Sequence, residues 1–127
     1  METIQLKVTP GPKGPHDEVE CDLASHSDYL VDEALILPHD KDFTLVFELD
    51  QNAPANWDLD NPFCARTGKC PPRKAQAHSH VRQTQVDKRR LEVEARAPNA
   101  KSVIHYRLNF DDGTTFDPII IHTVASK

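Results

Sequence analysis

The chain has 127 residues and a formal net charge of −5, and 38% of its residues are hydrophobic. A chain of this length is typical of one domain and needs no disulfide or metal framework for stability, so we expect a single domain over residues 1–127. Nucleic-acid-binding proteins usually carry a net positive charge or an extensive basic surface, whereas this chain is acidic overall. No run approaches the roughly 18 apolar residues of a membrane span. We therefore expect neither nucleic acid nor a membrane as a partner.

Short runs of alternating apolar and polar residues recur along the chain, at residues 4–8, 19–23, 43–49, 91–97 and 104–110. Such alternation is typical of strands with one buried and one solvent-exposed face. Residues 28–37 fit either a helix or a strand, and we favour a strand or short turn that ends at Pro38. With about seven to nine strands at this length, the sequence predicts an all-β fold, an antiparallel β-sandwich of immunoglobulin-like type.

Residues 51–80 interrupt this pattern, and we expect one long irregular loop here. The segment contains the single Trp, two of the three Cys residues and a His-Ser-His sequence. The charge also reverses along it: residues 1–60 carry fourteen acidic residues against three Lys or Arg, whereas residues 61–90 carry one acidic residue against eight Lys or Arg. Loops of this length in compact domains are usually functional or disordered. The loop is therefore the leading candidate for a recognition surface.

Two groups of candidate binding residues lie in the loop. Trp57 and Phe63 are expected to be apolar anchors, and the basic rim consists of Arg66, Lys69, Arg73 and Lys74. Such a rim suits carboxylate, phosphate or sulfate groups, so a small anionic ligand is an alternative to a protein partner. The simpler interpretation is that the aromatic rings cover the end of the core and the charged side chains are solvated.

The cysteines allow several interpretations. A disulfide between Cys64 and Cys70 would close a short loop and stabilise it by about 2–3 kcal/mol, but free thiols are the alternative in a reducing compartment. Cys21 lies on the apolar face of an alternating run and is expected to be a small buried hydrophobic residue.

His78 and His80 are candidate metal ligands. Together with Cys64 and Cys70 they have the ligand types of a zinc site, but the spacing of the thiols differs from that of structural zinc sites. The two histidines alone would suit Zn²⁺ or Cu²⁺ once a further ligand joined them, for which the candidates are His16, His26, His39, His105 and His122. The simpler interpretation is two polar residues that precede a strand, and no cofactor is then expected.

The end of the chain forms a predicted hairpin. Asp112 and Gly113 lie between two alternating runs and favour a two-residue turn with positive φ at both positions. Pro118 lacks a backbone donor and therefore marks an edge or a bulge, and residues 119–121 are a candidate edge strand. If two such edges paired, the protein would form a homodimer.

This hairpin also resembles a known family. Residues 106–113, Tyr-Arg-Leu-Asn-Phe-Asp-Asp-Gly, are followed by Asp117-Pro118 and three isoleucines. This pattern is similar to the ending of small uncharacterised bacterial β-sandwich proteins of the DP-EP family. The Glu-Pro element of that family has no counterpart here, and the loop at 51–80 is not part of its pattern. The resemblance implies a sandwich fold and no particular activity.

The sequence favours a binding protein over an enzyme. It contains no nucleophile elbow, no phosphate-binding Gly-rich loop and no His-Glu-x-x-His motif. We therefore expect non-catalytic binding of a protein partner, or self-association, through the loop at 51–80. Metal binding is the first alternative, and a small β-sandwich enzyme of unknown reaction is the second. The N-terminus lacks the features of a secretory signal, so a cytoplasmic location is the default expectation.

Overall fold

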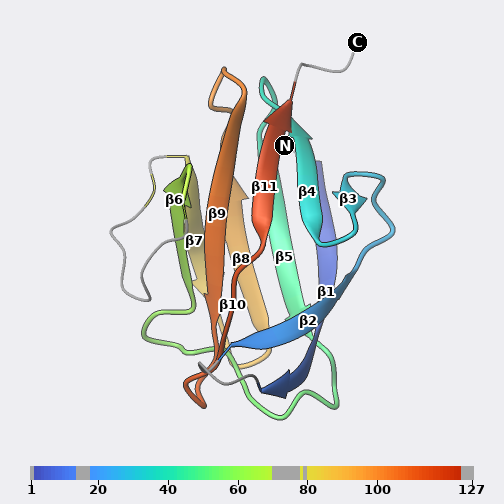
Figure 1. Ribbon diagram of the computed structural model, residues 1–127, viewed down its shortest axis with the longest axis vertical. Coiled ribbons are helices and arrows are strands. Elements are labelled where there is room, and N and C mark those ends of the chain that lie inside the picture. Colours follow the sequence, from blue (N-terminus) through green and yellow to red (C-terminus); the bar gives the residue numbers. More distant parts are fainter. Residues whose placement is uncertain (1, 14–17, 70–77, 79, 124–127) are drawn as a thin grey trace.

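The computed structural model describes residues 2–13, 18–69, 78 and 80–123 (Figure 1). In these residues the chain forms strands and no helix, and so contains no helix that could cross a membrane. The strands are β1 (Glu2–Lys13), β2 (Val19–Ala24), β3 (Leu30–Val31), β4 (Ala34–Pro38), β5 (Phe43–Leu49), β6 (Phe63–Thr67), β7 (Val81–Val86), β8 (Arg90–Ala95), β9 (Ser102–Asn109), β10 (Thr115–Phe116) and β11 (Ile119–Thr123). The prediction of an all-β protein is confirmed.

The described strands form two sheets (Figure 1). One has the order β2-β1-β5-β8-β7. In the other, β10 and β11 pair with successive parts of one side of β9, β6 pairs with its other side, and β11 continues to β4 and β3. Most ladders are antiparallel, but β1 pairs with β5 and β4 pairs with β11 in parallel. The prediction of a purely antiparallel sandwich is therefore wrong for these two ladders. Parallel neighbours need a long connection, and here the chain visits the opposite sheet between them.

The core lies between the two sheets and follows the predicted alternation. Ile4, Leu6 and Val8 of β1 are at most 1% exposed, whereas the residues between them face solvent. Burying an aliphatic or aromatic side chain of this size contributes about 1.5–3 kcal/mol. At the centre, the ring of Tyr106 lies 5.8 Å from that of Phe47, so aromatic residues from both sheets meet there.

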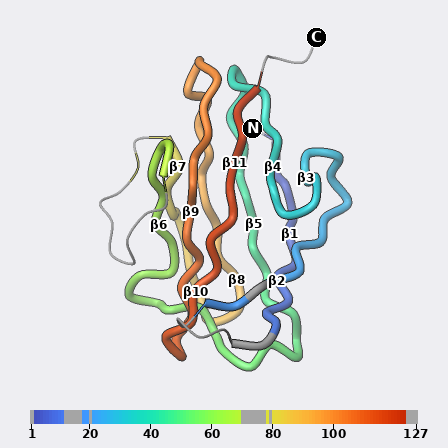
Figure 2. The backbone as a smooth tube through the Cα atoms, viewed as in Figure 1, coloured from blue at the N-terminus to red at the C-terminus, as the bar shows by residue number. Residues whose placement is uncertain are grey.

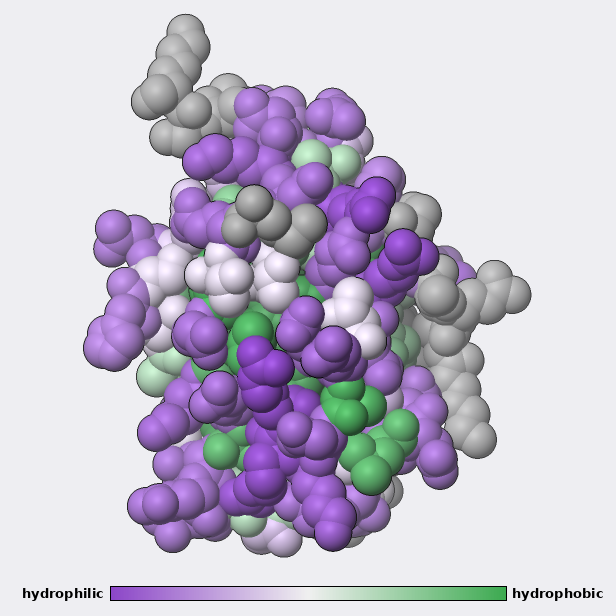
Figure 3. Space-filling model, turned by 180° about the vertical axis from the view of Figure 1, so that it is seen from behind, coloured by the Kyte–Doolittle hydropathy of each residue, from purple (hydrophilic) through white to green (hydrophobic). Residues whose placement is uncertain are grey.

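The outer face of the five-stranded sheet is mainly hydrophilic (Figure 3). Ion pairs connect its strands: Arg90 on β8 lies 3.8 Å from Glu48 on β5 and 3.5 Å from Glu92. These side chains are partly exposed, and such surface pairs contribute at most about 1 kcal/mol each. The outer face of this sheet is therefore exposed to solvent, and its ion pairs add little to stability.

The C-terminal hairpin differs from its prediction in three ways. The N–H of Phe110 donates to the carbonyl of Thr114 at 3.0 Å, and φ is +89° at Gly113 and not positive at Asp112. The turn is therefore a three-residue loop with a left-handed glycine, the next most common hairpin geometry after the two-residue turn. Pro118 lies between β10 and β11, and the register with β9 continues unchanged across it, so the prediction of an edge or a bulge at Pro118 is wrong. β11 pairs with both β9 and β4, so the prediction that residues 119–121 form an edge is also wrong.

Candidate functional site

The segment at residues 51–80 is only partly irregular. It contains β6, which pairs with β9 from Phe63↔Leu108 to Thr67↔Ile104, and an isolated bridge joins Trp57 to Phe110. The prediction of one irregular loop is therefore wrong. The sequence of β6 does not alternate, because its first three residues are all buried and its last two are exposed. Period-two alternation could not detect such a strand.

Trp57 and Phe63 are core residues. Trp57 is fully buried, with its ring stacked on Phe110 at a centroid distance of 5.2 Å. Phe63 is 8% exposed and stacks on Tyr106 at 5.6 Å. The prediction that these two rings are exposed anchors is wrong, and the simpler interpretation holds: they cover one end of the core.

Arg89 fixes the backbone of residues 50–56, a role that sequence reasoning missed. Its guanidinium donates to the carbonyls of Asp50 and Ala55 at 2.6 and 3.3 Å, and to the side-chain oxygen of Asn56 at 3.2 Å. A guanidinium offers five donors in a rigid fork, so one side chain satisfies several carbonyls. In the sequence Arg89 is one member of a basic block, and no local pattern marks it as structural.

The remaining predicted loop residues are only partly described. Arg66 at the end of β6 and Lys69 after it are exposed, as a basic rim requires, whereas Arg73 and Lys74 lie outside the described residues. Cys64 is buried on β6, and Cys70 also lies outside the described residues. The basic rim and the Cys64–Cys70 disulfide therefore stay predictions. Cys21 is 1% exposed, and burial raises the pKa of its thiol to about 12, as expected for an inert core residue.

His78 uses both ring nitrogens within the fold. Its Nδ1 accepts the backbone N–H groups of His80 and Val81 at 3.0 and 3.2 Å, and its Nε2 lies 2.7 Å from the hydroxyl of Thr67. Because Nδ1 accepts twice, the ring proton of the neutral imidazole lies on Nε2, which donates to Thr67. Burial and the neighbouring His80 lower the pKa of His78. This imidazole positions the start of β7.

His122 lies near His78 and His80, at the same end of the sandwich. It is 2% exposed, on the core side of β11, with Nδ1 3.4 Å from the hydroxyl of Ser102. Burial lowers its pKa to about 4, with smaller contributions from the nearby His80, His39 and His78. Within the part of the chain that the structure describes, no group of three or more His, Cys, Asp or Glu side chains is arranged to hold a metal ion. Metal binding through His78 and His80 stays a prediction.

A groove lies along an open edge of β1. β1 pairs with β5 from Glu2 onwards but with β2 only from Lys7 onwards, since β2 ends at Ala24. The chain then crosses to β3 in the other sheet (Figure 2). It leaves a hollow of about 670 Å³ between residues 2–5 and residues 25–29, a volume typical of ligand sites. The hollow occupies the place where a longer β2 would have continued.

The backbone of β1 directs hydrogen-bonding groups into this groove. The carbonyl of Val8 accepts from Asp50, which follows β5, and the carbonyl of Gln5 accepts from the hydroxyl of Ser25 at 2.6 Å. Even-numbered residues of β1 thus bond towards β5 and odd-numbered ones towards the opposite side, since these directions alternate along a strand. The N–H and C=O of Thr3 and the N–H of Gln5 therefore face the groove, where no described strand pairs with them.

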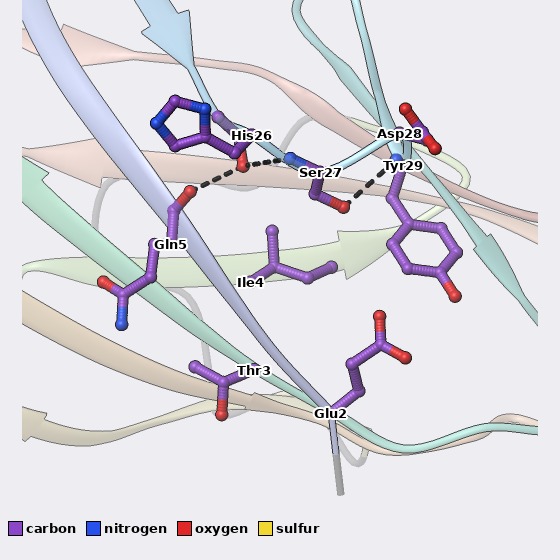
Figure 4. Close-up of a pocket in the computed structure, with 9 residues that line it drawn as sticks. Glu2, Thr3, Ile4, Gln5, His26, Ser27, Asp28 and Tyr29 are labelled. Atoms are coloured by element: carbon purple, nitrogen blue, oxygen red, sulfur yellow. Dashed lines mark hydrogen bonds between the residues drawn. The ribbon is translucent and has the colours of Figure 1, made fainter.

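Residues 25–29 form the opposite wall of the groove, and hydrogen bonds from backbone N–H groups to serine hydroxyls hold their conformation. The hydroxyl of Ser25 accepts from the N–H of Ser27, and the hydroxyl of Ser27 accepts from the N–H of Tyr29, both at 3.2 Å (Figure 4). Such serine turns stabilise a fixed loop conformation. The ring of Tyr29 packs edge-on against Phe43 at 5.1 Å. The groove is thus formed in advance of any ligand.

The groove has serine, histidine and aspartate side chains, but their arrangement is not that of a nucleophile with its base. The hydroxyl of Ser25 donates to Gln5, and the ring of His26 and the hydroxyl of Ser27 point in opposite directions (Figure 4). An activated nucleophile needs its base within hydrogen-bonding distance. The arrangement favours binding over covalent chemistry. Sequence reasoning missed this site, because an open edge depends on where the neighbouring strand ends.

Comparisons with protein-family models, curated proteins and solved structures find no match to this chain. The resemblance of the last hairpin to the DP-EP family, and with it the immunoglobulin-like type, stays a prediction.

Proposed function

We propose that this protein is a non-catalytic binding module, and that it binds an extended segment of a partner polypeptide as an added strand beside residues 2–5 of β1. One observation carries the proposal: the open edge of β1 lies in a preformed groove of about 670 Å³. Strand addition at an exposed sheet edge is a recurring mode of peptide recognition, in which main-chain hydrogen bonds supply affinity.

The geometry limits the size and strength of the interaction. Four residues of strand span about 13 Å, so the groove accommodates three to five residues of a partner. The three edge groups of Thr3 and Gln5 can each form a hydrogen bond worth about 0.5–1.5 kcal/mol net. Together these bonds supply about 1.5–4.5 kcal/mol, whereas a Kd of about 0.1–1 mM requires about 4–5.5 kcal/mol, so burial of the partner's side chains must supply the remainder and the contact is weak and reversible.

An outside partner suits this edge better than a second copy of the chain. Two β1 edges paired antiparallel about a two-fold axis would bring the same acidic groove of each copy together, including Glu2 and Asp28 of both. Like charges placed close together destabilise such a pairing. A homodimer through β1 is therefore an outcome that the test must distinguish.

The test is NMR titration of ¹⁵N-labelled full-length protein with the peptide acetyl-Thr-Val-Thr-Val-Thr-amide. We expect saturable shifts of the backbone amides at residues 2–5 and 24–29. Thr3→Pro should abolish them, because proline removes a donor that faces the groove but leaves the β5 ladder intact. Gln83→Pro is the matched control, since the register of β7 directs this exposed residue's N–H away from β8.

Either of two results would contradict the proposal. One is that neither this peptide nor its charged derivatives shift those amides at about 1 mM, a concentration that detects even weak binding. The other is a concentration-dependent dimer in sedimentation experiments that protects the amides of residues 2–5, which would assign the edge to self-association.

A further inference from the structure

The inner wall of the groove is apolar at its base and acidic at its rim. Glu2, Ile4 and Tyr29 lie on one side of β1, whereas Thr3 and Gln5 point to the other side (Figure 4). Ile4 is only 1% exposed, so the half-buried ring of Tyr29 supplies the accessible apolar surface, whereas the carboxylates of Glu2 and Asp28 are exposed. A side chain that enters from an added strand therefore meets the ring of Tyr29 first and negative charge beyond it.

The described residues that line the groove carry acidic charge. These nine residues include two carboxylates and no Lys or Arg. The surrounding sequence has the same sign, because residues 1–60 carry fourteen acidic residues and only three Lys or Arg. A groove lined by one sign of charge concentrates ligands of the opposite sign. Charge complementarity thus selects a cationic partner.

We propose that the groove recognises a basic extended segment, one of whose inward-facing Lys or Arg side chains lies along the ring of Tyr29 and ends between Glu2 and Asp28. This inference rests on the proposed strand addition and adds the side-chain chemistry of the partner. Side chains alternate along an added strand, so every second one faces this wall. Lys and Arg combine an apolar stem with a charged end, which matches the order of surfaces here.

Tyr29 is positioned to contribute directly. Its ring is held by the edge contact with Phe43, and its carbonyl accepts from the N–H of Ile36 on β4 at 2.8 Å. A cation beside an aromatic face gains a favourable interaction with the ring's quadrupole. The ring therefore favours Lys or Arg over an uncharged side chain of equal length.

The test compares three peptides, acetyl-Thr-Val-Xaa-Val-Thr-amide with Lys, Gln or Glu as Xaa, in the same NMR titration. We expect the Lys peptide to bind about fivefold more tightly than the Gln peptide, as for one exposed ion pair, and the Glu peptide to bind most weakly. Glu2→Gln and Asp28→Asn should each weaken Lys-peptide binding by about two- to fivefold and leave Gln-peptide binding unchanged. Asp60→Asn, which neutralises an exposed carboxylate outside the groove, is the matched control.

The results distinguish the two proposals. If all three peptides bind equally and Thr3→Pro still abolishes binding, strand addition stands and the selection of a cation is wrong. If Tyr29→Leu weakens Lys-peptide and Gln-peptide binding to the same extent, the ring acts only as apolar surface and its proposed role is overturned. If no peptide binds, the proposed function fails together with this inference.

Discussion

Lowering the pH from 7 to 5 should destabilise the folded chain through His122. This imidazole is 2% exposed and held neutral, with a pKa of about 4 against its ordinary 6.5. The unfolded chain therefore binds a proton between these two values that the folded chain does not. The contribution of the neutral His122 to stability is therefore present above about pH 6.5 and is lost as the pH falls towards 4.

The size of this effect follows from the two pKa values. The full difference corresponds to about 3 kcal/mol, of which about 2 kcal/mol is lost between pH 7 and pH 5. The groups that face His122 from neighbouring elements are Ser102 on β9, His39 after β4, and His78 and His80 before β7. None of these carries a negative charge that could stabilise the imidazolium.

The assay is urea denaturation at a series of pH values, followed by the fluorescence of the single Trp57, which is fully buried. His122→Gln should remove most of the dependence between pH 7 and pH 5, whatever its effect on absolute stability, and the lowered pKa of His78 accounts for the smaller part that remains. His26→Gln, at an exposed histidine, should leave the dependence as in the wild type. Equal losses in the wild type and His122→Gln would refute the reasoning.

Two further pairs of substitutions test the structural roles of Trp57 and Arg89. Trp57→Ala should destabilise the protein by about 3–5 kcal/mol because it empties a core site, whereas Leu59→Ala, at a residue 50% exposed, should change stability by less than about 0.5 kcal/mol. Arg89→Lys should cost about 1–3 kcal/mol because a single ammonium cannot reach all the acceptors of the guanidinium, and Lys88→Ala, at an exposed neighbour, is its control. Denaturation followed by circular dichroism measures both. Equal stability within either pair would contradict the assignment of Trp57 or Arg89 as structural.

Alternation predicted five of the eleven strands in the described residues, because it is a local property. Every second residue of a half-buried strand must be apolar, and β1, β2, β5, β8 and β9 follow this rule. It failed for β6, whose first three residues are all buried. Hydropathy also could not place Trp57 and Phe63, since an aromatic residue that covers a core and one that anchors a partner look the same in the sequence.

The groove could not be predicted because no residue in it is unusual. Thr3 and Gln5 resemble the polar positions of any half-exposed strand. What distinguishes them is that β2 ends at Ala24, opposite Lys7 and thus two residues short of Gln5 and four short of Thr3, and that the chain then crosses to the other sheet. Edge status is a relation between strands, and a single strand's sequence does not contain it.

The sequence by itself determined the all-β class, the main strands, the acidic first half of the chain and the absence of familiar catalytic motifs. Side-chain hydropathy and charge are local, so these features can be read residue by residue. Tertiary structure alone decided that the aromatic rings at 57 and 63 are core, that Arg89 holds residues 50–56, and that no described strand pairs with residues 2–5 of β1 on the side opposite β5. Each of these depends on contacts between segments far apart in the chain, and long-range pairing sets which groups are satisfied and which face a ligand.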